Sequence, residues 1–280
     1  MGITPAQLER YDRDGFVVLA DFVDEASCNR LRTRAEELVQ EFDPQGVVSI
    51  FSTHEQNRIS DDYFLESGGK IRFFFEEHAF LPDGSLKQNK DRSINKIGHA
   101  LHDLDPIFNQ FSRAKQIREL TASLAIEEPL LLQSMYIFKQ PNIGGEVACH
   151  QDSTFLYTEP TQIAGLWFAL EDATVENGCL WVIPGGHRLG LKSRWVRSHE
   201  GGMRFDVIDP YPFPEQKLVP LEVTKGTLVV LHGLLPHKSL PNKSQKSRHA
   251  YSLHVISGRS VYPDTNWLQR PAEMPLRGFE

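Results

Sequence analysis

The chain has 280 residues, of which 40% are hydrophobic and 24% are charged. These proportions are ordinary for a globular protein with enough apolar residues to form a large core. The net charge of −7 argues against nucleic acid as a main partner, because nucleic-acid-binding surfaces are basic.

Cysteine usage and hydropathy predict where the protein resides. Cys28, Cys149 and Cys179 have no Cys-x-x-Cys spacing, and an odd number of cysteines without a framework predicts a reducing compartment. There is no apolar run of about 18 residues, so no membrane span is expected. The N-terminus lacks a basic-then-apolar signal, and residues 277–280 are not a peroxisomal Ser-Lys-Leu tail. We therefore expect a cytoplasmic protein with no membrane partner.

The first part of the chain is predicted to begin with a capped helix. Thr4, Pro5 and Gln7 have the spacing of a capping box with proline at the first helical position. Asp14-Gly15 is expected to end this helix, and residues 16–19 predict a buried strand. The chain then enters a second helical pattern.

A second helix is predicted from Asp24 onward, because apolar side chains recur every three or four residues along it. This apolar stripe consists of Cys28, Leu31, Ala35, Leu38 and Phe42. Its expected role is core packing rather than cofactor binding.

The next part of the chain is predicted to be less regular. Residues 43–70 are polar and predict a loop, whereas residues 70–75 predict a strand. His99 and His102 are three apart, but no third metal ligand is near them in the sequence, so we expect ordinary polar residues. A further helix is predicted over residues 105–124, starting at Asp105-Pro106.

From Pro129 onward the pattern changes to short strands. The expected strands are residues 130–138, 164–170, 227–232 and 248–256. Asn177-Gly178 is a hairpin signal and predicts a tight connection from the second of these strands to residues 179–187. Residues 188–217 are charged and contain three prolines, which predicts a long irregular insertion of the kind that often forms a lid.

No linker or repeat divides the sequence. We therefore expect one domain over residues 1–280, with a helix-rich part at about 1–125 and an antiparallel β core at about 129–257.

The first candidate functional residues are His150 and Asp152. On an extended strand, side chains two positions apart point to the same face, so this imidazole and carboxylate can be presented to one point. A lone His-x-Asp is a weak signal in a chain with 11 histidines and 37 acidic residues. A solvated histidine beside a surface aspartate is the plain alternative.

Two later residues strengthen this pattern. His237 offers a second imidazole, and Arg248 follows it at a spacing compatible with neighbouring strands. Two histidines and one carboxylate with open positions form the facial triad of non-haem Fe(II) oxygenases. A guanidinium grips a carboxylate with two parallel hydrogen bonds, so Arg248 predicts a carboxylate co-substrate, and 2-oxoglutarate is the implied one.

Three other residues near this pattern have alternatives open. His232 rivals His237 as a ligand, although its spacing to Arg248 fits less well. His254 shares strand parity with Arg248 and can face the interior, where a hydrogen-bonded core histidine is the expected role. Cys149 alternates away from His150 and is not expected to touch a metal.

Stretches along nearly the whole chain carry a likeness to a known family. They are Asp14-Gly15-Phe16, Lys70 to Phe75, Ser93 to His102, Gln133 to Pro141, the region of His150 and Asp152, Glu171 to Pro184, His237-Lys238-Ser239 and Asn266 to Gln269. In these stretches the chain resembles the phytanoyl-CoA dioxygenase family of Fe(II)/2-oxoglutarate oxygenases. One departure is Gly185-Gly186-His187, where relatives often have Pro-Gly-Ser-His, and it affects no ligand.

The resemblance implies a mostly β fold with flanking helices, whose core is a double-stranded β-helix (jelly roll, cupin-like). It implies iron ligands at His150, Asp152 and His237, and pairing of Arg248 with the distal carboxylate of 2-oxoglutarate. By the same likeness, the co-substrate pocket is lined by Lys96, Met135, Trp167 and Ser239.

The implied activity is a dioxygenase reaction with Fe(II), in which 2-oxoglutarate and O2 are converted to succinate and CO2. Ascorbate can support such enzymes. The expected coupled reaction is hydroxylation of a small organic substrate, because related halogenases lack the carboxylate that Asp152 provides. A monomer is expected.

Two other classes of protein remain as alternatives. One is a catalytically silent jelly-roll protein that binds metal and 2-oxoglutarate, and the other is a zinc hydrolase with the same ligands. The substrate is not expected to be phytanoyl-CoA, because a coenzyme A site should show clustered basic residues. Only scattered candidates occur, in the insertion, and they suggest a solvated lid: Arg188, Lys192, Arg194 and Arg197.

Overall fold

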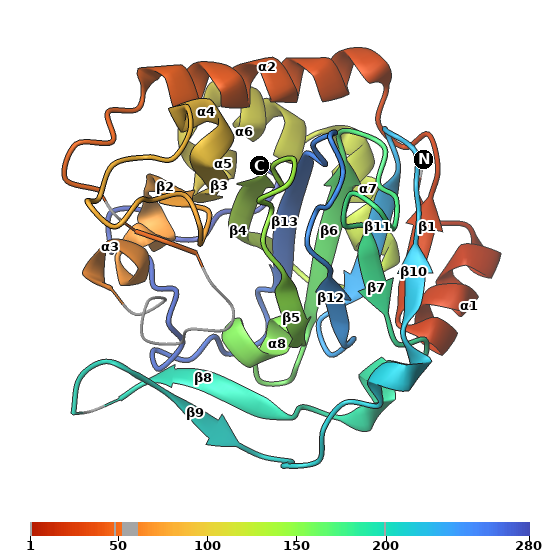
Figure 1. Cartoon of the computed structure of the whole chain (residues 1–280). Helices are drawn as coiled ribbons and strands as arrows, with labels where there is room; N and C mark the ends of the chain where they lie inside the picture. The colour runs from red at the N-terminus through yellow and green to blue at the C-terminus, as the bar shows by residue number, and fades with distance from the viewer. Residues whose placement is uncertain (1, 48, 52–60, 199) are drawn as a thin grey trace.

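The computed structural model describes residues 2–47, 49–51, 61–198 and 200–280. Residues 48 and 52–60 of the predicted loop therefore lie outside the described residues. Two facing antiparallel sheets form the centre of the molecule, and helices surround them (Figure 1). No helix in the described ranges is long and apolar enough to cross a membrane.

The major sheet has seven strands in the order β1-β11-β6-β13-β4-β3-β2, and every neighbouring pair is antiparallel. Its strands are β1 (Phe16–Leu19), β2 (Ile71–Phe75), β3 (Ile94–His99), β4 (Pro129–Ile137), β6 (Ile163–Ala169), β11 (Leu228–His232) and β13 (Ala250–Ser257). The N-terminal part of the chain thus supplies both edges of this sheet.

The smaller sheet has four strands in the order β10-β7-β12-β5. They are β5 (Val147–His150), β7 (Leu180–Val182), β10 (Val219–Leu221) and β12 (His237–Ser239). A separate two-stranded sheet consists of β8 (Ser193–Arg197) and β9 (Met203–Val207). The arrangement of the two larger sheets is that of a double-stranded β-helix.

The helices lie mainly before β4. They are α1 (Pro5–Asp14), α2 (Glu25–Glu41), α3 (Asp62–Leu65), α4 (Lys90–Ser93), α5 (Leu101–Leu104), α6 (Pro106–Ser112), α7 (Lys115–Ser123) and α8 (Asp152–Phe155), with short 3-10 segments η2 (Ser67–Gly69), η3 (Gly186–Leu189) and η4 (Glu215–Lys217). In Figure 1, α2 lies across the top of the sheets, and the β8–β9 hairpin lies along the opposite side.

The ends of α1 are set by the predicted local signals. Thr4 Oγ1 accepts a hydrogen bond from the Gln7 backbone at 3.3 Å, and Gln7 Oε1 accepts one from the Thr4 backbone at 2.9 Å. These bonds satisfy N–H groups that have no partner within the helix. Gly15 closes the helix in the left-handed conformation, at φ 81°, which glycine adopts without steric cost.

The apolar stripe of α2 is buried in the core, as predicted. Its buried side chains join one hydrophobic cluster with residues of β6, β11 and β13, among them Leu166, Val230 and Leu253. Burial of these side chains is the main stabilising contribution, at about 25 cal/mol per Å² of apolar surface. α2 thus packs into this core beside α4 and α6.

Two predictions for the first part of the chain were wrong. In β1, Val17 and Leu19 are buried but Val18 is 38% exposed, so this edge strand buries one face rather than both. The helix predicted over residues 105–124 is two helices, because Ala114 adopts an extended ψ of 144° between α6 and α7. The break places Arg113 beside Asp103, with 2.6 Å between Nη2 and Oδ1.

Three connections also differ from prediction. The turn at Asn177-Gly178 forms, and the Asn177 side chain holds it by donating to Asp172 O at 2.8 Å. It joins β6 of the major sheet to β7 of the smaller sheet, however, so the two strands are not a hairpin. The insertion at 188–217, predicted to be irregular, contains the β8–β9 hairpin, because Trp195 pairs with Phe205 and both side chains face inward. The predicted loop 43–70 contains α3 and η2.

Candidate functional site

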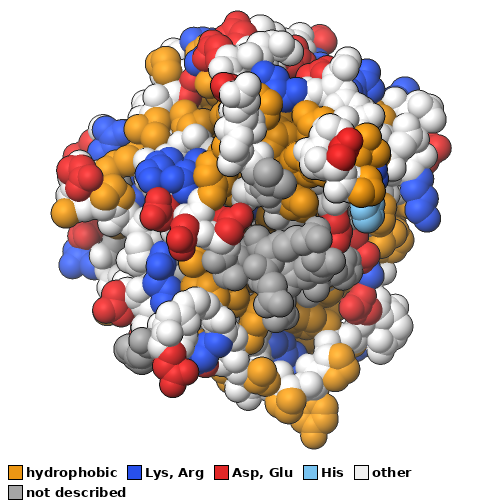
Figure 2. All heavy atoms as spheres, turned by 60° about the vertical axis from the view of Figure 1, so that its left-hand side comes forward, with side chains coloured by type: hydrophobic (Ala, Val, Ile, Leu, Met, Phe, Trp, Pro, Cys, Tyr) orange, Lys and Arg blue, Asp and Glu red, His pale blue; other side chains and the backbone are white. Residues whose placement is uncertain are grey.

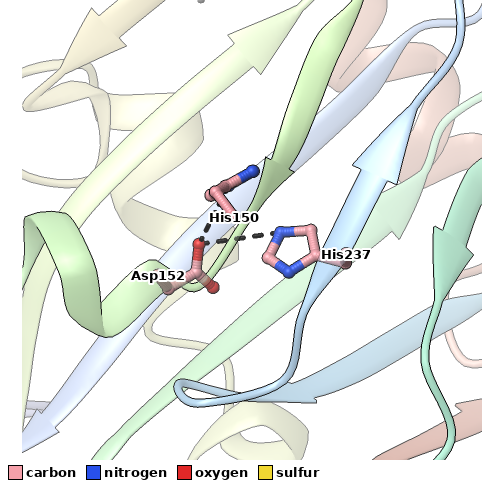
Figure 3. Close-up of side chains that lie close together, drawn as sticks. All are labelled: His150, Asp152 and His237. Carbon is pink, nitrogen blue, oxygen red and sulfur yellow. Dashed lines mark ion pairs between the residues drawn. The ribbon is translucent and has the colours of Figure 1, made fainter. Parts of the chain in front are cut away.

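His150, Asp152 and His237 meet at one end of the smaller sheet (Figure 3). His150 is the last residue of β5, and His237 is the first residue of β12, where the two residues pair across the strands. The prediction that Asp152 continues the strand after His150 was wrong. Asp152 is the first residue of α8, so the chain turns after His150 and directs the carboxylate back toward the imidazoles.

The three side chains present their ligand atoms to a common point. Oδ1 of Asp152 lies 3.7 Å from Nε2 of His150 and 3.7 Å from Nε2 of His237. Nδ1 of His150 donates to Ala148 O at 2.8 Å, and Nδ1 of His237 donates to Leu235 O at 3.0 Å. A carbonyl oxygen only accepts, so these bonds put the proton on Nδ1 and leave both Nε2 lone pairs for a metal.

Burial and the neighbouring side chains together set the protonation of the cluster. Burial lowers the pKa of His150 to about 4, with a further contribution from the charge of His237. Burial alone would raise the pKa of Asp152, but the neighbouring histidines, His254 first, hold it below its usual value. At neutral pH the site therefore offers a neutral imidazole and a carboxylate, which are the forms that bind metals.

Arg248 lies two residues before the start of β13 and is 2% exposed. Its Nε donates to Gly178 O at 3.1 Å, and its guanidinium lies 5.2 Å from the centre of the Trp167 ring. Nη1 is buried and has no hydrogen-bond partner among the described residues. Burial lowers the pKa of Arg248 to about 10, so it is still a cation at neutral pH. A buried cation with a free donor is suited to an anionic ligand.

Ser239 and Trp167 are brought to the same place as Arg248. Ser239 Oγ donates at 2.9 Å to the same carbonyl, Gly178 O, that Arg248 contacts. Ser239 is two residues after His237 on β12, so both side chains point to one face. β12 thus connects Ser239 with the candidate metal-ligand cluster, which consists of His150, Asp152 and His237.

Lys96 and Met135 lie next to the cluster from the major sheet. Lys96 Nζ is 3.8 Å from Met135 Sδ and 3.6 Å from the centre of the Phe51 ring. Burial lowers the pKa of Lys96 to about 7. Both residues line a cavity of about 260 Å³ together with His150 and Asp152.

The outer wall of this cavity is mostly aromatic. It is lined by Phe51, Phe64, Phe155, Trp195, Phe205, Phe213 and Trp267. Trp195 and Phe205 come from the β8–β9 hairpin, and Phe155 from α8 contacts the His150 ring at 5.8 Å between centroids. Sequence reasoning missed these residues, and for the hairpin the available signal was the alternation of apolar with charged side chains over 203–207. On the face shown in Figure 2, hydrophobic side chains gather at the lower edge and in the upper half, among interspersed charges.

The structure also places the other histidines that the sequence analysis considered. His232 packs on His187, with 5.1 Å between ring centroids, and is not in the metal-ligand cluster. His99 and His102, expected to be ordinary polar residues, are fully buried and hydrogen-bond to Ser67 and Ser134. His254 faces the interior and contacts Asp152, with 3.3 Å between Nε2 and Oδ2.

Comparisons with known proteins agree with this architecture. The model of a family described as phytanoyl-CoA dioxygenase (PhyH) matches residues 11–250. The chain is 50% identical to "Phytanoyl-CoA dioxygenase" of Arabidopsis thaliana, over 98% of this chain and 95% of that protein. It is 45% identical to "Phytanoyl-CoA dioxygenase domain-containing protein 1" of Bos taurus, over 98% of this chain and 97% of that protein.

Solved structures show the same fold at low sequence identity. The non-heme alpha ketoglutarate dependent carbocyclase SnoK superposes with a TM-score of 0.66 at 15% identity, over 99% of this chain and 97% of that chain. EctD from S. alaskensis with 2-oxoglutarate and 5-hydroxyectoine superposes with a TM-score of 0.62 at 19% identity, over 91% and 76%. The predicted jelly-roll fold class is confirmed.

Proposed function

This chain belongs to the phytanoyl-CoA dioxygenase family, and from this premise we propose that it is an Fe(II)- and 2-oxoglutarate-dependent dioxygenase. The observation that carries the proposal is the convergence of His150, Asp152 and His237 with their free ligand atoms facing one another. Two imidazoles and one carboxylate with open positions suit a non-haem Fe(II) centre.

Each residue of the chain has a defined task in this proposal. His150, Asp152 and His237 bind the metal, and the backbone carbonyls of residues 148 and 235 orient the two imidazoles. When bound, Fe(II) supplies the site at which 2-oxoglutarate and O2 react to give succinate and CO2. The retained carboxylate of Asp152 favours coupled hydroxylation over halogenation.

The co-substrate is proposed to bind between the metal and Arg248. The unpartnered Nη1 of Arg248 would pair with the distal carboxylate, and Ser239 shares its carbonyl contact with that guanidinium. Trp167 packs on the same cation. Lys96 and Met135 line the cavity beside His150 and Asp152. These contacts disfavour a zinc hydrolase, which has no use for a buried arginine at this position.

The substrate is proposed to be a small organic molecule that enters against the aromatic wall. The basic residues of the insertion contact other groups of the protein, whereas the sequence suggested a solvated lid. Lys192 pairs with Asp209, Arg194 lies 4.1 Å from the centre of the Tyr157 ring, and Arg197 donates to Trp267 O at 2.6 Å. These contacts leave little basic surface there for coenzyme A phosphates. We therefore retain the proposal that phytanoyl-CoA is not the substrate, and formation of 2-hydroxyphytanoyl-CoA by the protein with Fe(II) would contradict it.

The proposed setting is the cytoplasm, and the three unpaired cysteines support a reducing environment.

The primary test measures succinate formed from 2-oxoglutarate by the purified protein with Fe(II), O2 and ascorbate. The Asp152→Ala and Arg248→Ala variants are the negative controls, and neither should form succinate. Turnover that requires both residues supports the oxygenase. Binding of 2-oxoglutarate without turnover, across a panel of candidate substrates, would favour the silent binding protein instead.

A further inference from the structure

A third histidine contacts the metal-ligand cluster from the opposite sheet. His254 is in β13 of the major sheet and is 4% exposed. Its Nε2 lies 3.3 Å from Oδ2 of Asp152. β13 is paired on both sides, with Gln133 of β4 and Gly165 of β6 opposite His254. The register with β4 shifts directly after His254, whereas the pairing with β6 is regular, so Gly165 fixes the strand from which the imidazole projects.

The two oxygens of Asp152 have different surroundings. Oδ1 faces the Nε2 atoms of His150 and His237 at 3.7 Å each. Oδ2 is buried, and no described residue makes a well-aligned hydrogen bond to it. His254 Nε2 is the donor that faces it. A buried carboxylate oxygen without a hydrogen-bond partner destabilises the folded protein. His254 is placed where its Nε2–H can donate to this oxygen.

Gly165 completes the enclosure of the same oxygen. A Cβ at this position would lie 2.9 Å from Oδ2 of Asp152 and 3.7 Å from Cδ2 of His254. Contacts below about 3.0 Å force atoms to move, so only glycine leaves room for the carboxylate in its present orientation. Two paired residues of the major sheet therefore define where Oδ2 can be.

We propose that His254 is a positioning residue, which holds Oδ2 of Asp152 and thereby directs Oδ1 toward the metal. The proposal rests on the metal site of the proposed function. A carboxylate can rotate between its two oxygens, and a charge-assisted hydrogen bond from Nε2–H fixes one orientation. Groups that orient metal ligands in this way typically change metal affinity by about 10–100-fold when removed.

The alternative is a histidine that only fills the core, and substitutions separate the two roles. His254→Phe keeps a ring of similar size but has no donor, whereas His254→Gln places an amide N–H near the position of Nε2. The probe is Co(II), whose affinity and visible absorption bands are measured by titration without O2 or 2-oxoglutarate. We expect about 10–100-fold weaker binding and an altered spectrum in His254→Phe, with substantial recovery of both in His254→Gln.

Gly165→Ala provides a second route to the same effect. Its added methyl group pushes Oδ2 from the other side, so we expect weaker Co(II) binding while His254 is intact. The matched control is His249→Phe. His249 is also a buried histidine and lies directly before β13, but its Nδ1 hydrogen-bonds to Tyr136 Oη at 2.8 Å, away from the cluster. The Co(II) affinity of this variant should equal that of the original protein. Circular dichroism and thermal unfolding identify any variant that does not fold.

The outcomes separate this inference from the proposed function. Unchanged Co(II) affinity and spectrum in folded His254→Phe would overturn it, as would equal losses in His254→Phe and His254→Gln. Loss in the phenylalanine variant with recovery in the glutamine variant supports it. If the original protein binds Co(II) in this His254-dependent way but forms no succinate with Fe(II), only the proposed dioxygenase activity fails.

Discussion

Oδ1 of Asp152 lies 3.7 Å from Nε2 of His237, although Asp152 begins a helix and His237 begins a strand far along the chain. The pairing of β5 with β12 brings these two segments together. The cluster is thus assembled by the fold before any ion is added. A preformed site should convert metal binding directly into stability.

The first prediction concerns this gain in stability. Mn(II), which occupies similar sites without reacting with O2, should raise the melting temperature of the protein. At a free concentration of 100 times Kd, the free energy of unfolding should rise by about 2.7 kcal/mol. Asp152→Ala should abolish the shift, because it removes the only anionic ligand of the cluster. Differential scanning calorimetry measures the shift in melting temperature. The control is Asp206→Ala, which removes a carboxylate that pairs with Arg204 away from the cluster. An equal shift in Asp152→Ala would contradict the assignment of Asp152 as a metal ligand.

The second prediction concerns Arg248→Lys. Lysine keeps the positive charge but cannot offer two parallel donors to a carboxylate. The affinity for 2-oxoglutarate should fall at least about tenfold, equivalent to about 1.4 kcal/mol, while Mn(II) affinity is retained. Isothermal titration with 2-oxoglutarate in the presence of Mn(II) tests this. The control is Arg32→Lys, because Arg32 pairs with Glu171 at 2.7 Å outside the site. This variant should bind 2-oxoglutarate normally. Normal binding by Arg248→Lys would rule out the two-pronged contact.

Much of this site could be predicted because its chemistry depends on residue type and spacing. The short spacing of His150 and Asp152 and the position of Arg248 relative to His237 were sufficient to place these residues near one another. The strand assumption for Asp152 was wrong, yet the carboxylate still reaches the cluster, since the turn into α8 returns it to the same point.

The rest could not be predicted, because it depends on pairing between distant segments. The role of His254 follows from its position opposite Gly165, and no local pattern encodes that register. Likewise, Asn177-Gly178 specifies a turn but not which sheet each flanking strand joins. Trp195 reaches the cavity because the β8–β9 hairpin brings it there, and its sequence neighbours, Arg194 and Val196, do not specify that placement.

The third prediction concerns Gly178, whose carbonyl accepts hydrogen bonds from both Ser239 and Arg248. Its φ is 85°, and a Cβ would lie 2.6 Å from Leu240 O. Gly178→Ala should therefore lower the free energy of unfolding by more than about 1 kcal/mol and weaken 2-oxoglutarate binding. Gly84→Ala is the matched control, because Gly84 has a φ of 84° but open space around the added methyl. Urea unfolding and titration should show a small loss of stability and normal binding in the control. Equal behaviour of the two variants would show that backbone strain alone is responsible.

The fourth prediction concerns the buried Lys96. Burial lowers its pKa from 10.5 to about 7, so between these pH values the unfolded chain binds more protons than the folded one. The contribution of Lys96 to the free energy of unfolding therefore rises with pH across this window, and the cost of its burial is greatest at pH 7 and below.

Replacing this amine with an apolar side chain of similar length should remove that cost. Lys96→Met should stabilise the protein at pH 7 by roughly 2–5 kcal/mol, and the gain should shrink as the pH is raised toward 10. The same variant should bind 2-oxoglutarate more weakly, because the cation beside the metal-ligand cluster is lost. Urea unfolding at pH 7 and pH 9.5 measures the first effect, with the exposed Lys87→Met as control. A stability difference that is the same at both pH values would contradict the pKa shift, and unaltered 2-oxoglutarate binding would remove Lys96 from the co-substrate site.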